Sequence, residues 1–568
     1  MKTEKLKQNV KGYVHQFEDG GLRLLRKGQK GVIHAIFSRF GLVLILLLLQ
    51  VGLLFSIFRW FGNLWPHYFG GSVVVTSAMV IYLLNSKMDN SAKITWMVVV
   101  AIAPVVSIPM FFYVKSNFGH NILRKRLLEL EDQLRGWLPQ SQKAVEQLKA
   151  LEPGAASLAK YLYGRGGGFP VYQNTAMTYF PGGEAKFEEL LRQLETAEEY
   201  IFVEYFIIDE GLMWGKILEV LARKALQGVD VRVMYDGTCE FSTLPRNYPR
   251  LLEKLNIQCK VFSPVQPFVS THYNYRDHRK ILVIDGRVGF TGGVNLADEY
   301  INHIQKHGRW KDAAVMLEGE AVRSLTAQFL QMWGILKEPE YEQFLTRPIP
   351  VPENAKGVAA PYGDCPLDGE RVGEMVYIDL LNRARDYIHI MTPYLILDGE
   401  LETALKFAAE RGVDVHLILP GKPDKQFPYA LAKSHYSALL DSGVKISEWS
   451  PGFVHAKVFV VDGREAVESI RVYIDTHYAE ELTVQNLAER FGFNPSYLGQ
   501  LFRKHTHLSL NQYIIQKRIS VAANLIRNDA SLTVKDIAMA VGYDDPLYFS
   551  RIFKRHTGFA PTELREKE

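Results

Sequence analysis

The stretch HRKILVIDGRVGFTGGVN, residues 278–295, decides the architecture of most of this chain. In it, His278 and Lys280 stand two residues apart, and in a strand that spacing places both side chains on one face. Together they can meet one phosphate, because the imidazole can attack phosphorus to form a phosphohistidine while Lys280 attracts the phosphate oxygens. A carboxylate such as Asp285 can fix the tautomer of the ring. This chemistry needs no metal ion and no cofactor.

A second, shorter copy of the motif occurs in HAKVFVVDG, residues 455–463. It repeats the spacing of the first copy with His455, Lys457 and Asp462. One such pair is more often solvated than functional, whereas two copies favour a paired site. There, one histidine can attack phosphorus and the other can protonate the leaving oxygen. The residues alone leave open which histidine attacks.

The sequence around the two motifs is duplicated as well. YIFVEYFIIDEG and LEVLARKALQGVDVRVMYDG lead to the first motif, and YIHIMTPYLILDG and LETALKFAAERGVDVHLILPG lead to the second. Each half predicts a strand, a helix and a strand before its HxKxxxxD element. We therefore expect an α/β domain in two halves, residues 155–345 and 346–463. The second half is incomplete, since Ser469, Ile470 and Val472 stand where Gly292, Gly293 and Asn295 should recur.

This arrangement resembles the phospholipase D superfamily. Residues 66–463 resemble the bacterial cardiolipin synthase family in both motifs and in FVEYFIIDEG, GRWKDAAVMLEG and TPYLILDGELETALKFAAERGVDVHLILPGKPD. The resemblance implies transfer of a phosphatidyl group from one phosphatidylglycerol to another through a phosphohistidine, giving cardiolipin and glycerol. It implies that His278 is the nucleophile and His455 the acid and base, with Asp285 and Asp462 in the catalytic motifs. The implied phosphate-binding residues are Lys280, Lys457, Asn295, Gly292 and Gly293.

Three uncharged apolar stretches precede the catalytic region, at residues 41–58, 68–86 and 94–114. Each is close to the ~20 residues that a helix needs to cross a bilayer. We therefore expect a basic segment, residues 1–40, then two or three transmembrane helices within residues 41–114, in a multi-pass protein of the bacterial cell membrane. The basic residues leave the topology open, because those before the first stretch and those after the third both favour the cytoplasm. The segment KSNFGHNILRKR can attract anionic lipid headgroups.

Composition excludes some classes of protein. Lys plus Arg number 66 against 62 Asp plus Glu, and this near balance excludes a strongly basic nucleic-acid coat. Three scattered cysteines, Cys239, Cys259 and Cys365, lack the spacing of a zinc site and do not indicate a disulfide framework. We expect neither a metal nor a cofactor, and the sequence does not reveal the oligomeric state.

After about residue 465 the pattern becomes wholly helical. LTVQNLAERFGFNPSYLGQLFRKHT, which begins at Leu482, is repeated as LTVKDIAMAVGYDDPLYFSRIFKRHT, which begins at Leu532. Each copy predicts a helix, a turn containing Gly492 or Gly542, and a second helix, which together make a helix-turn-helix. Apolar residues at helical spacing predict the core, namely Leu498, Leu501, Phe502, Phe549, Ile552 and Phe553.

Residues 466–568 resemble the DNA-binding domain of AraC-type transcription regulators, above all in IAMAVGYDDPLYFSRIFKRHTGFAPTELR. The resemblance implies an all-α domain that binds double-stranded DNA. It implies base contacts from Ser496, Gln500, Leu547 and Arg551, and contacts nearer the phosphates from Arg503, Lys504, Lys554 and Arg555. His507 departs from the family pattern, which has the Gly found at Gly558. A left-handed backbone there is mildly unfavourable for His.

Only GREAVES separates Asp462 from the first helix of this domain, and the segment is neither a flexible nor a stiff linker. Loss of the strand after the second motif would expose an unpaired sheet edge. Three interpretations follow: a membrane-bound cardiolipin-forming enzyme impaired by truncation, a membrane-tethered AraC-family regulator, and a chimaera of two genes without evolved combined function. A phospholipase D-type nuclease is a weaker alternative. We favour the chimaera for the origin of the chain and the enzyme for its biochemical activity.

Overall fold

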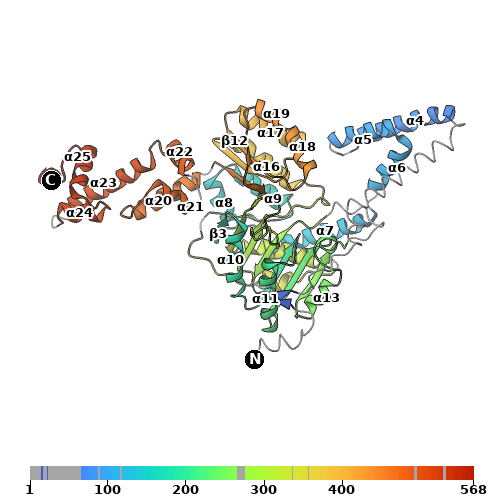
Figure 1. Cartoon of the computed structure of the whole chain (residues 1–568), viewed down its shortest axis with the longest axis horizontal. Helices are drawn as coiled ribbons and strands as arrows, with labels where there is room; N and C mark the ends of the chain where they lie inside the picture. Colours follow the sequence, from blue (N-terminus) through green and yellow to red (C-terminus); the bar gives the residue numbers. More distant parts are fainter. Residues whose placement is uncertain are drawn as a thin grey trace. The chain divides into compact units, whose positions relative to one another are not determined.

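The structure, a computed structural model, describes residues 15–16, 22–23, 65–86, 88, 90–115, 118–264, 276–335, 337–355, 357–462, 464–491, 495–528 and 532–567. The chain divides into two compact units, Met1–Phe459 and Val460–Glu568 (Figure 1). The first contains both α/β halves up to the second HxK pair, and the second contains the helical region.

The described N-terminal region contains three helices. They are α4 (Trp65–Leu84), α5 (Asn90–Ile102) and α6 (Pro104–Lys115). Within the described residues, no helix combines the length and the apolar character needed to cross a bilayer. The predictions of transmembrane helices within residues 41–114 and of a multi-pass membrane location are therefore wrong for this part, and the stretch 41–58 lies outside the described residues.

Two local features explain this difference. The stretch 94–114 forms two short helices instead of one, because α5 ends at Ile102 and Pro104, which lacks an amide hydrogen, begins α6. In α4, the first eight residues, WPHYFGGS, include Pro, His, Gly and Ser, so the continuous apolar part is much shorter than the helix. The three helices pack on one another around Met79, Leu83, Val100 and Phe111.

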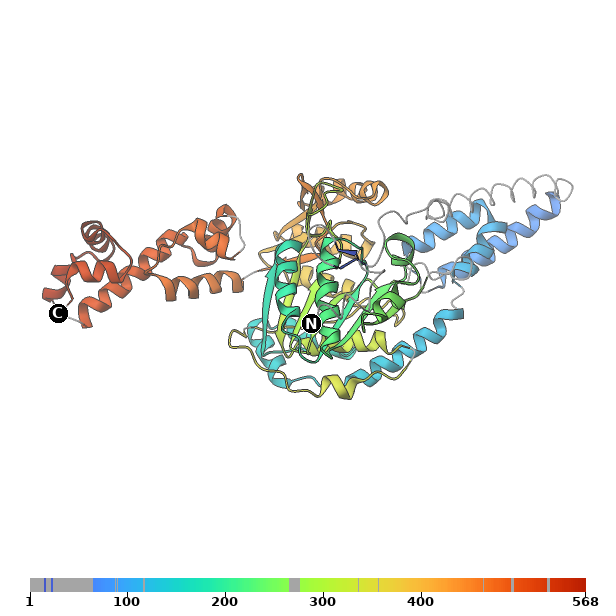
Figure 2. The same ribbon diagram turned by 60° about the horizontal axis from the view of Figure 1, so that its bottom comes forward.

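A seven-stranded sheet forms the first half of the α/β region (Figure 2). Its strand order is β3-β10-β8-β7-β4-β5-β6. In chain order the strands are β3 (Thr175–Phe180), β4 (Tyr200–Tyr205), β5 (Asp230–Asp236), β6 (Gln258–Phe262), β7 (Lys280–Ile284), β8 (Val288–Gly292) and β10 (Ala314–Gly319). The HxK strand β7 therefore lies inside the sheet, between β4 and β8.

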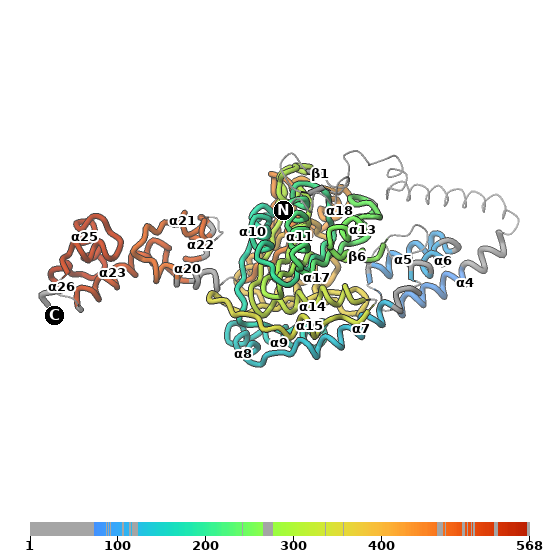
Figure 3. Tube along the Cα trace, turned by 90° about the horizontal axis from the view of Figure 1, so that it is seen from below, coloured from blue at the N-terminus to red at the C-terminus, as the bar shows by residue number. Residues whose placement is uncertain are grey.

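Helices cover both faces of this sheet, and strand β4 shows why. Its residues Ile201 and Val203 face one core together with α10 (Gly183–Leu194), α11 (Leu212–Leu226) and α13 (Tyr248–Glu253). Phe202, between them, faces the opposite core with α14 (Val322–Trp333), α15 (Tyr341–Leu345) and α7 (Phe118–Trp137). In Figure 3, the labels of α10 and α11 lie apart from those of α14 and α15, in agreement with the two separate cores. The helices α8 (Gln142–Leu151), α9 (Ala155–Gly164) and α12 (Cys239–Ser242) complete this part.

The second half repeats the central part of this design. Its four-stranded sheet has the order β13-β12-β11-β15, which corresponds to β6-β5-β4-β7. The strands are β11 (Tyr387–Met391), β12 (Asp414–Pro420), β13 (Lys445–Trp449) and β15 (Val458–Val461). The helices are α16 (Val372–Arg383), α17 (Gly399–Glu410), α18 (Gln426–Ser434) and α19 (Tyr436–Asp441). The predicted α/β duplication is confirmed.

The two HxK strands differ in what surrounds them. All five residues of β7 are buried, whereas none of the four residues of β15 is buried. In the described chain the second sheet ends at β15, and α20 (Arg464–His477) begins three residues after it instead of a counterpart of β8. The second half is thus incomplete directly after its HxKxxxxD motif, as the sequence predicts.

The second unit is helical throughout its described part from α20 onward. It continues with α21 (Val484–Phe491), α22 (Pro495–Thr506), α23 (Leu510–Asn528), α24 (Val534–Ala540), α25 (Pro546–Thr557) and α26 (Pro561–Lys567). The pairs α21–α22 and α24–α25 are the two predicted helix-turn-helix motifs. Leu498, Phe502, Phe549 and Phe553 are fully buried, and Ile552 is partly buried, as predicted for the core. The side chain of Leu501 lies outside the described residues.

Candidate functional site

A pairing between the halves builds the site. The short strand β9 (Arg309–Lys311) pairs in parallel with β14 (Gly452–Val454), and Val454 lies opposite Lys311. The next residues along the two segments are Asp312 and His455, and the His455 amide donates to the Lys311 carbonyl over 2.7 Å. The pairing therefore brings Asp312 of the first half against the histidine of the second.

Asp312 orients the ring of His455. Its Oδ2 lies 2.7 Å from His455 Nδ1, and the carboxylate is fully buried. A carboxylate accepts the Nδ1 hydrogen, which leaves Nε2 of His455 for a substrate. Burial lowers the pKa of His455, and the hydrogen bond to Asp312 partly offsets that effect.

Gly293 makes room for this carboxylate. A Cβ at position 293 would overlap Asp312 Oδ1, so any larger residue would displace the carboxylate from His455. Gly292 has a φ of 140°, which residues with a side chain rarely adopt, and it packs against the backbone of Ala313 and Ala314. The two glycines, predicted to bind phosphate, thus have a structural reason to be glycine.

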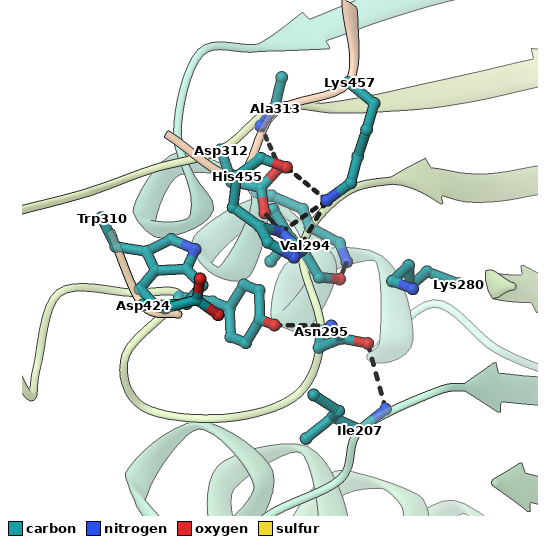
Figure 4. A network of polar contacts seen from close by, with 12 residues as sticks. Ile207, Lys280, Val294, Asn295, Trp310, Asp312, Ala313, Asp424, His455 and Lys457 are labelled. Carbon is teal, nitrogen blue, oxygen red and sulfur yellow. Dashed lines mark hydrogen bonds and ion pairs between the residues drawn. The ribbon is translucent and has the colours of Figure 1, made fainter. Parts of the chain in front are cut away.

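Lys457 and Lys280 bring positive charge to the site from both halves (Figure 4). Lys457 Nζ lies 2.9 Å from Nδ1 and 3.0 Å from Nε2 of His455. Lys280 Nζ donates to the carbonyl of His278 over 2.6 Å and lies above the ring of Phe206. Burial lowers the pKa of Lys280 to about 7, and the charge of Lys457 adds to this effect. Burial lowers the pKa of Lys457 to about 8, although the carboxylates of Asp312 and Asp424 oppose the shift. The site is therefore rich in basic groups and suited to an anion.

His278 reaches the same site without a carboxylate among its principal electrostatic neighbours. Its ring packs on Phe206, with 4.7 Å between the ring centroids. Burial, followed by the charges of Lys280, Lys457, His455 and Lys425, lowers its pKa to about 3. His278 is thus a neutral imidazole near pH 7, and its partners include residues of both halves, as expected for a paired site.

The two aspartates of the HxKxxxxD motifs, Asp285 and Asp462, lie in the turns that follow the HxK strands. The Asp285 carboxylate accepts hydrogen bonds from the backbone amides of Glu198, Glu199 and Tyr200, at 2.8–2.9 Å, and so holds the beginning of β4. The expectation that Asp285 fixes the His278 tautomer is therefore wrong. Asp285 and Asp462 share a left-handed backbone, with φ of 50° and 40°, which marks the same turn after each HxK strand. Among the described residues, the carboxylate that bonds to a motif histidine is Asp312, which the sequence signals only within GRWKD.

Asn295 is buried and bonds to the segment that follows β4. Its Oδ1 accepts from the Ile207 amide over 3.1 Å, and its Nδ2 donates to the Tyr300 hydroxyl over 2.7 Å. Lys186, which is also buried, donates to the Val294 carbonyl over 3.2 Å and to the Tyr205 hydroxyl over 2.9 Å. These bonds fix the loop that follows β8. One hydrogen of the Asn295 amide is left for a phosphate oxygen, and its phosphate-binding role stays a prediction.

One carboxylate cluster in the described chain has the spacing of a metal site. It consists of Glu374, Asp398 and Glu400. Arg371 pairs with Glu374 at 2.9 Å and with Asp398 at 3.4 Å, so a cation of the protein already neutralises the cluster. These carboxylates give no reason to assign a metal.

The second unit exposes the residues predicted to contact DNA. In α25, Leu547, Arg551, Lys554 and Arg555 are exposed, and in α22, Ser496, Gln500 and Arg503 are exposed. The side chain of Lys504 lies outside the described residues. The Asp545 side chain caps α25 by accepting from the Leu547 amide over 2.8 Å, which fixes the first turn that presents Leu547. The geometry suits insertion of α25 into a groove, while the individual DNA contacts stay predictions.

Comparison with known proteins gives two families. Residues 190–333 and 377–473 match the family model described as "Cardiolipin synthase, PLD-like domain", and residues 487–567 match "Helix-turn-helix domain". The cardiolipin synthase of Geobacillus kaustophilus is 35% identical over 400 residues, which are 69% of this chain and 78% of that protein. An uncharacterized protein of Streptococcus mutans is 55% identical over 389 residues, 68% of this chain and 84% of that protein.

Solved structures also resemble the helical end. The C-terminal domain of AraT, a response regulator from Geobacillus stearothermophilus, is 31% identical, and the match covers 18% of this chain and 85% of that domain with a TM-score of 0.18.

Proposed function

Because the chain belongs to the cardiolipin synthase family of the phospholipase D superfamily and ends in an AraC-type helix-turn-helix domain, we propose that its first unit is a phosphatidyltransferase. Its substrates are two phosphatidylglycerol molecules, and its products are cardiolipin and glycerol. One observation carries this proposal: the β9–β14 pairing brings the HxK pairs of both halves to one buried, basic site. The basic side chains of such a site can attract and hold a phosphodiester, which is an anion.

The different partners of the two histidines support a division of roles, because His455 has a carboxylate partner and His278 packs on Phe206. His278 is neutral, so its imidazole can attack phosphorus, and the bond from phosphorus to the glycerol oxygen breaks. In its protonated form, His455 gives its Nε2 proton to that oxygen, and the hydrogen bond to Asp312 favours this form against the effect of burial. Free glycerol leaves, and a phosphatidyl group remains on His278.

The second step reverses the first with another acceptor. A hydroxyl of the second phosphatidylglycerol gives its proton to Nε2 of His455, and its oxygen attacks phosphorus. The phosphorus–nitrogen bond breaks, cardiolipin leaves, and His278 is neutral again. Lys280 and Lys457 attract the phosphate oxygens in both steps, and the bound anion raises the pKa of every basic group around it.

Activity of the chain should be weak. Among the described residues, the second half has no counterpart of β8, and the sequence has Val472 in place of a second Asn295, so one predicted phosphate-binding group and its supporting strand are missing. Loss of one such donor typically lowers a rate by ~10² to 10³. Lipid analysis of a cardiolipin-deficient host that expresses the chain tests both points. A trace of cardiolipin that disappears with His278→Ala is expected, and none at all would contradict the reaction. Full accumulation would show that the missing segment is dispensable.

The second unit supports a second activity, sequence-specific binding of double-stranded DNA. The supporting observation is the exposed basic face of α25, with Arg551, Lys554 and Arg555. Arg551→Ala should lower sequence preference by roughly 1–3 kcal/mol, as for a bidentate base contact, whereas Lys554→Ala should weaken binding to all sequences alike. Selection of bound sites from random DNA by the whole chain, repeated at two salt concentrations, measures both effects. Equal loss of preference in both variants would contradict the assignment.

The two activities need not serve one purpose. Asp462 and α20 are separated by the single residue Gly463, and β15 ends its sheet there. We infer that the chain joins parts of two genes. Continuous sequencing of genomic DNA across codons 455–480 tests this inference, because a frame running from Asp462 into a Gly- and Asn-containing segment would show that the join is not native.

A further inference from the structure

Next to His455 lies a group of side chains that the two catalytic steps do not use. Trp310 of β9 contacts His455 with 5.4 Å between ring centroids, and it contacts Phe453 at 4.8 Å. Tyr394, which follows β11, contacts the same Phe453 at 6.2 Å. The Tyr394 hydroxyl donates to Asp424 Oδ2 over 2.6 Å, and Asp424 precedes α18. Residues of both halves therefore meet on the side of the general acid.

Two polar atoms of this group are buried and have no hydrogen-bond partner. One is Nε1 of Trp310, a residue that is only 8% exposed, and the other is Oδ1 of Asp424. Tyr394 and Phe453 link the two residues, because Asp424 bonds to Tyr394, Tyr394 contacts Phe453, and Phe453 contacts Trp310. Figure 4 draws both Trp310 and Asp424 in the network around His455. Nε1 carries a hydrogen and can only donate, whereas a carboxylate oxygen can only accept. Buried donors and acceptors are rarely left without a hydrogen bond, so each of these two atoms can bind a polar group of a ligand.

We propose that Trp310 and Asp424 form a subsite for a hydroxyl group of the glycerol headgroup of phosphatidylglycerol. A hydroxyl is both donor and acceptor, so one hydroxyl can accept from Trp310 Nε1 and donate to Asp424 Oδ1. The inference rests on the proposed function, and it assigns the residues that select a polyol next to the phosphate. The oxygen that His455 protonates would belong to the same glycerol.

The surroundings of Asp424 hold its carboxylate in this place. Tyr394 occupies Oδ2, and Lys425 Nζ lies 3.8 Å from Oδ2 and 3.3 Å from the Tyr394 hydroxyl. Oδ1 is therefore left for a ligand, while Lys425, which is exposed, partly neutralises the charge. A site built to pair a substrate hydroxyl discriminates strongly against an analogue without it, because its own polar groups would then stay unpaired.

Binding of two small phosphates to the whole chain tests the subsite. Glycerol 1-phosphate and propyl phosphate share the phosphate and the three carbons and differ in the hydroxyl groups. By isothermal titration calorimetry, we expect glycerol 1-phosphate to bind about 10- to 100-fold more tightly, as for one neutral and one charge-assisted hydrogen bond. Asp424→Asn and Trp310→Phe should each reduce the preference, measured as the ratio of the two affinities, to about threefold or less.

Trp333→Phe is the matched control. Trp333 is another buried indole, which stacks on Phe329 in the opposite core, and its replacement should leave the preference intact. Equal binding of the two phosphates by the unmodified chain would overturn the proposal, and so would variants that weaken both probes equally. A chain that keeps the preference and makes no cardiolipin would refute the proposed reaction while supporting the subsite.

Discussion

Asp312 is the residue on which the protonation of His455 depends. Asp312→Asn keeps the size of the side chain and removes the charge that holds Nδ1–H, so the ring can adopt the wrong tautomer. We expect turnover to fall by about 10² to 10⁴, with little change in phospholipid binding. Radiolabelled phosphatidylglycerol conversion by the purified chain measures the rate, and a pH–rate profile reports the lost acidic group.

Asp285→Asn is the control, since this carboxylate holds backbone amides and no histidine. It should lower the free energy of unfolding by about 1–3 kcal/mol and leave the rate per folded molecule nearly unchanged. The reverse pattern, a rate loss for Asp285→Asn alone, would contradict the assignment of both residues.

Lys280 and Lys457 predict the pH dependence of anion binding. Their pKa values of about 7 and 8 in the empty site mean that both are charged at pH 6 and largely neutral at pH 9. A phosphodiester favours the charged forms, so its affinity should fall at least about 10-fold as pH rises from 6 to 9, and binding should take up protons in that range. Calorimetry with dimethyl phosphate in two buffers measures both. Lys280→Met should flatten the profile, and an unmodified profile that is flat would refute the prediction.

Residue spacing predicted the site histidines and lysines but did not reveal the contact of Asp312 with His455. The HxK pairs could be predicted because two residues of one strand share a face whatever the rest of the fold does. Asp312 and His455 lie 143 residues apart, and only the β9–β14 pairing brings them together. The predicted contact of Asp285 with His278 failed because Asp285 lies in the turn after β7. There its carboxylate bonds to backbone amides at the beginning of β4.

At the level of elements, equivalent residues of the two HxK strands differ in burial, because β7 is buried and β15 is not. Val283 and Val460 each follow the motif lysine by three residues, and Val283 is fully buried whereas Val460 is 44% exposed. Val283→Lys should prevent folding of the first unit, because a buried unpaired charge costs several kcal/mol. Val460→Lys should be tolerated and should reduce self-association, since charged residues protect sheet edges.

Circular dichroism and light scattering of the two variants test this contrast. Unfolding of Val460→Lys to the extent of Val283→Lys would mean that β15 is covered in solution.

The ends of α22 and α25 give a second matched pair. His507 has a φ of 59° and Gly558 a φ of 84°, so the left-handed backbone expected at His507 is confirmed. His507→Gly should raise the stability of the second unit by roughly 0.5–1 kcal/mol, because glycine adopts this conformation without steric strain. Gly558→Ala should lower it by a similar amount. Urea denaturation followed by circular dichroism measures both, and destabilisation by His507→Gly would contradict the argument.

Apolar patterns predicted helices correctly where the helix has one apolar face and one polar face. The stripes of α22 and α25 are amphipathic, so their buried residues could be identified from helical spacing. The stretch 94–114 is apolar on all sides, and its length alone indicated a membrane span. Pro104 divides it into α5 and α6, which bury part of their surface against α4. Length therefore outweighed the proline in the sequence-based interpretation.

At the scale of the whole molecule, the two compact units should melt separately. The first unit ends at Phe459 and the second begins at Val460, and each has its own core. We expect two thermal transitions in differential scanning calorimetry of the whole chain. Phosphate should raise only the transition of the first unit, by RT ln(1 + [L]/Kd), or about 2.7 kcal/mol at 100-fold excess over Kd.

Two variants assign the transitions. Lys280→Met should abolish the phosphate effect, and His507→Gly should raise the other transition alone, since the two residues belong to different units. A single transition that responds to both variants would show that the units fold cooperatively. The join after Asp462 would then be part of one evolved structure, and the chimaeric origin would have to be abandoned.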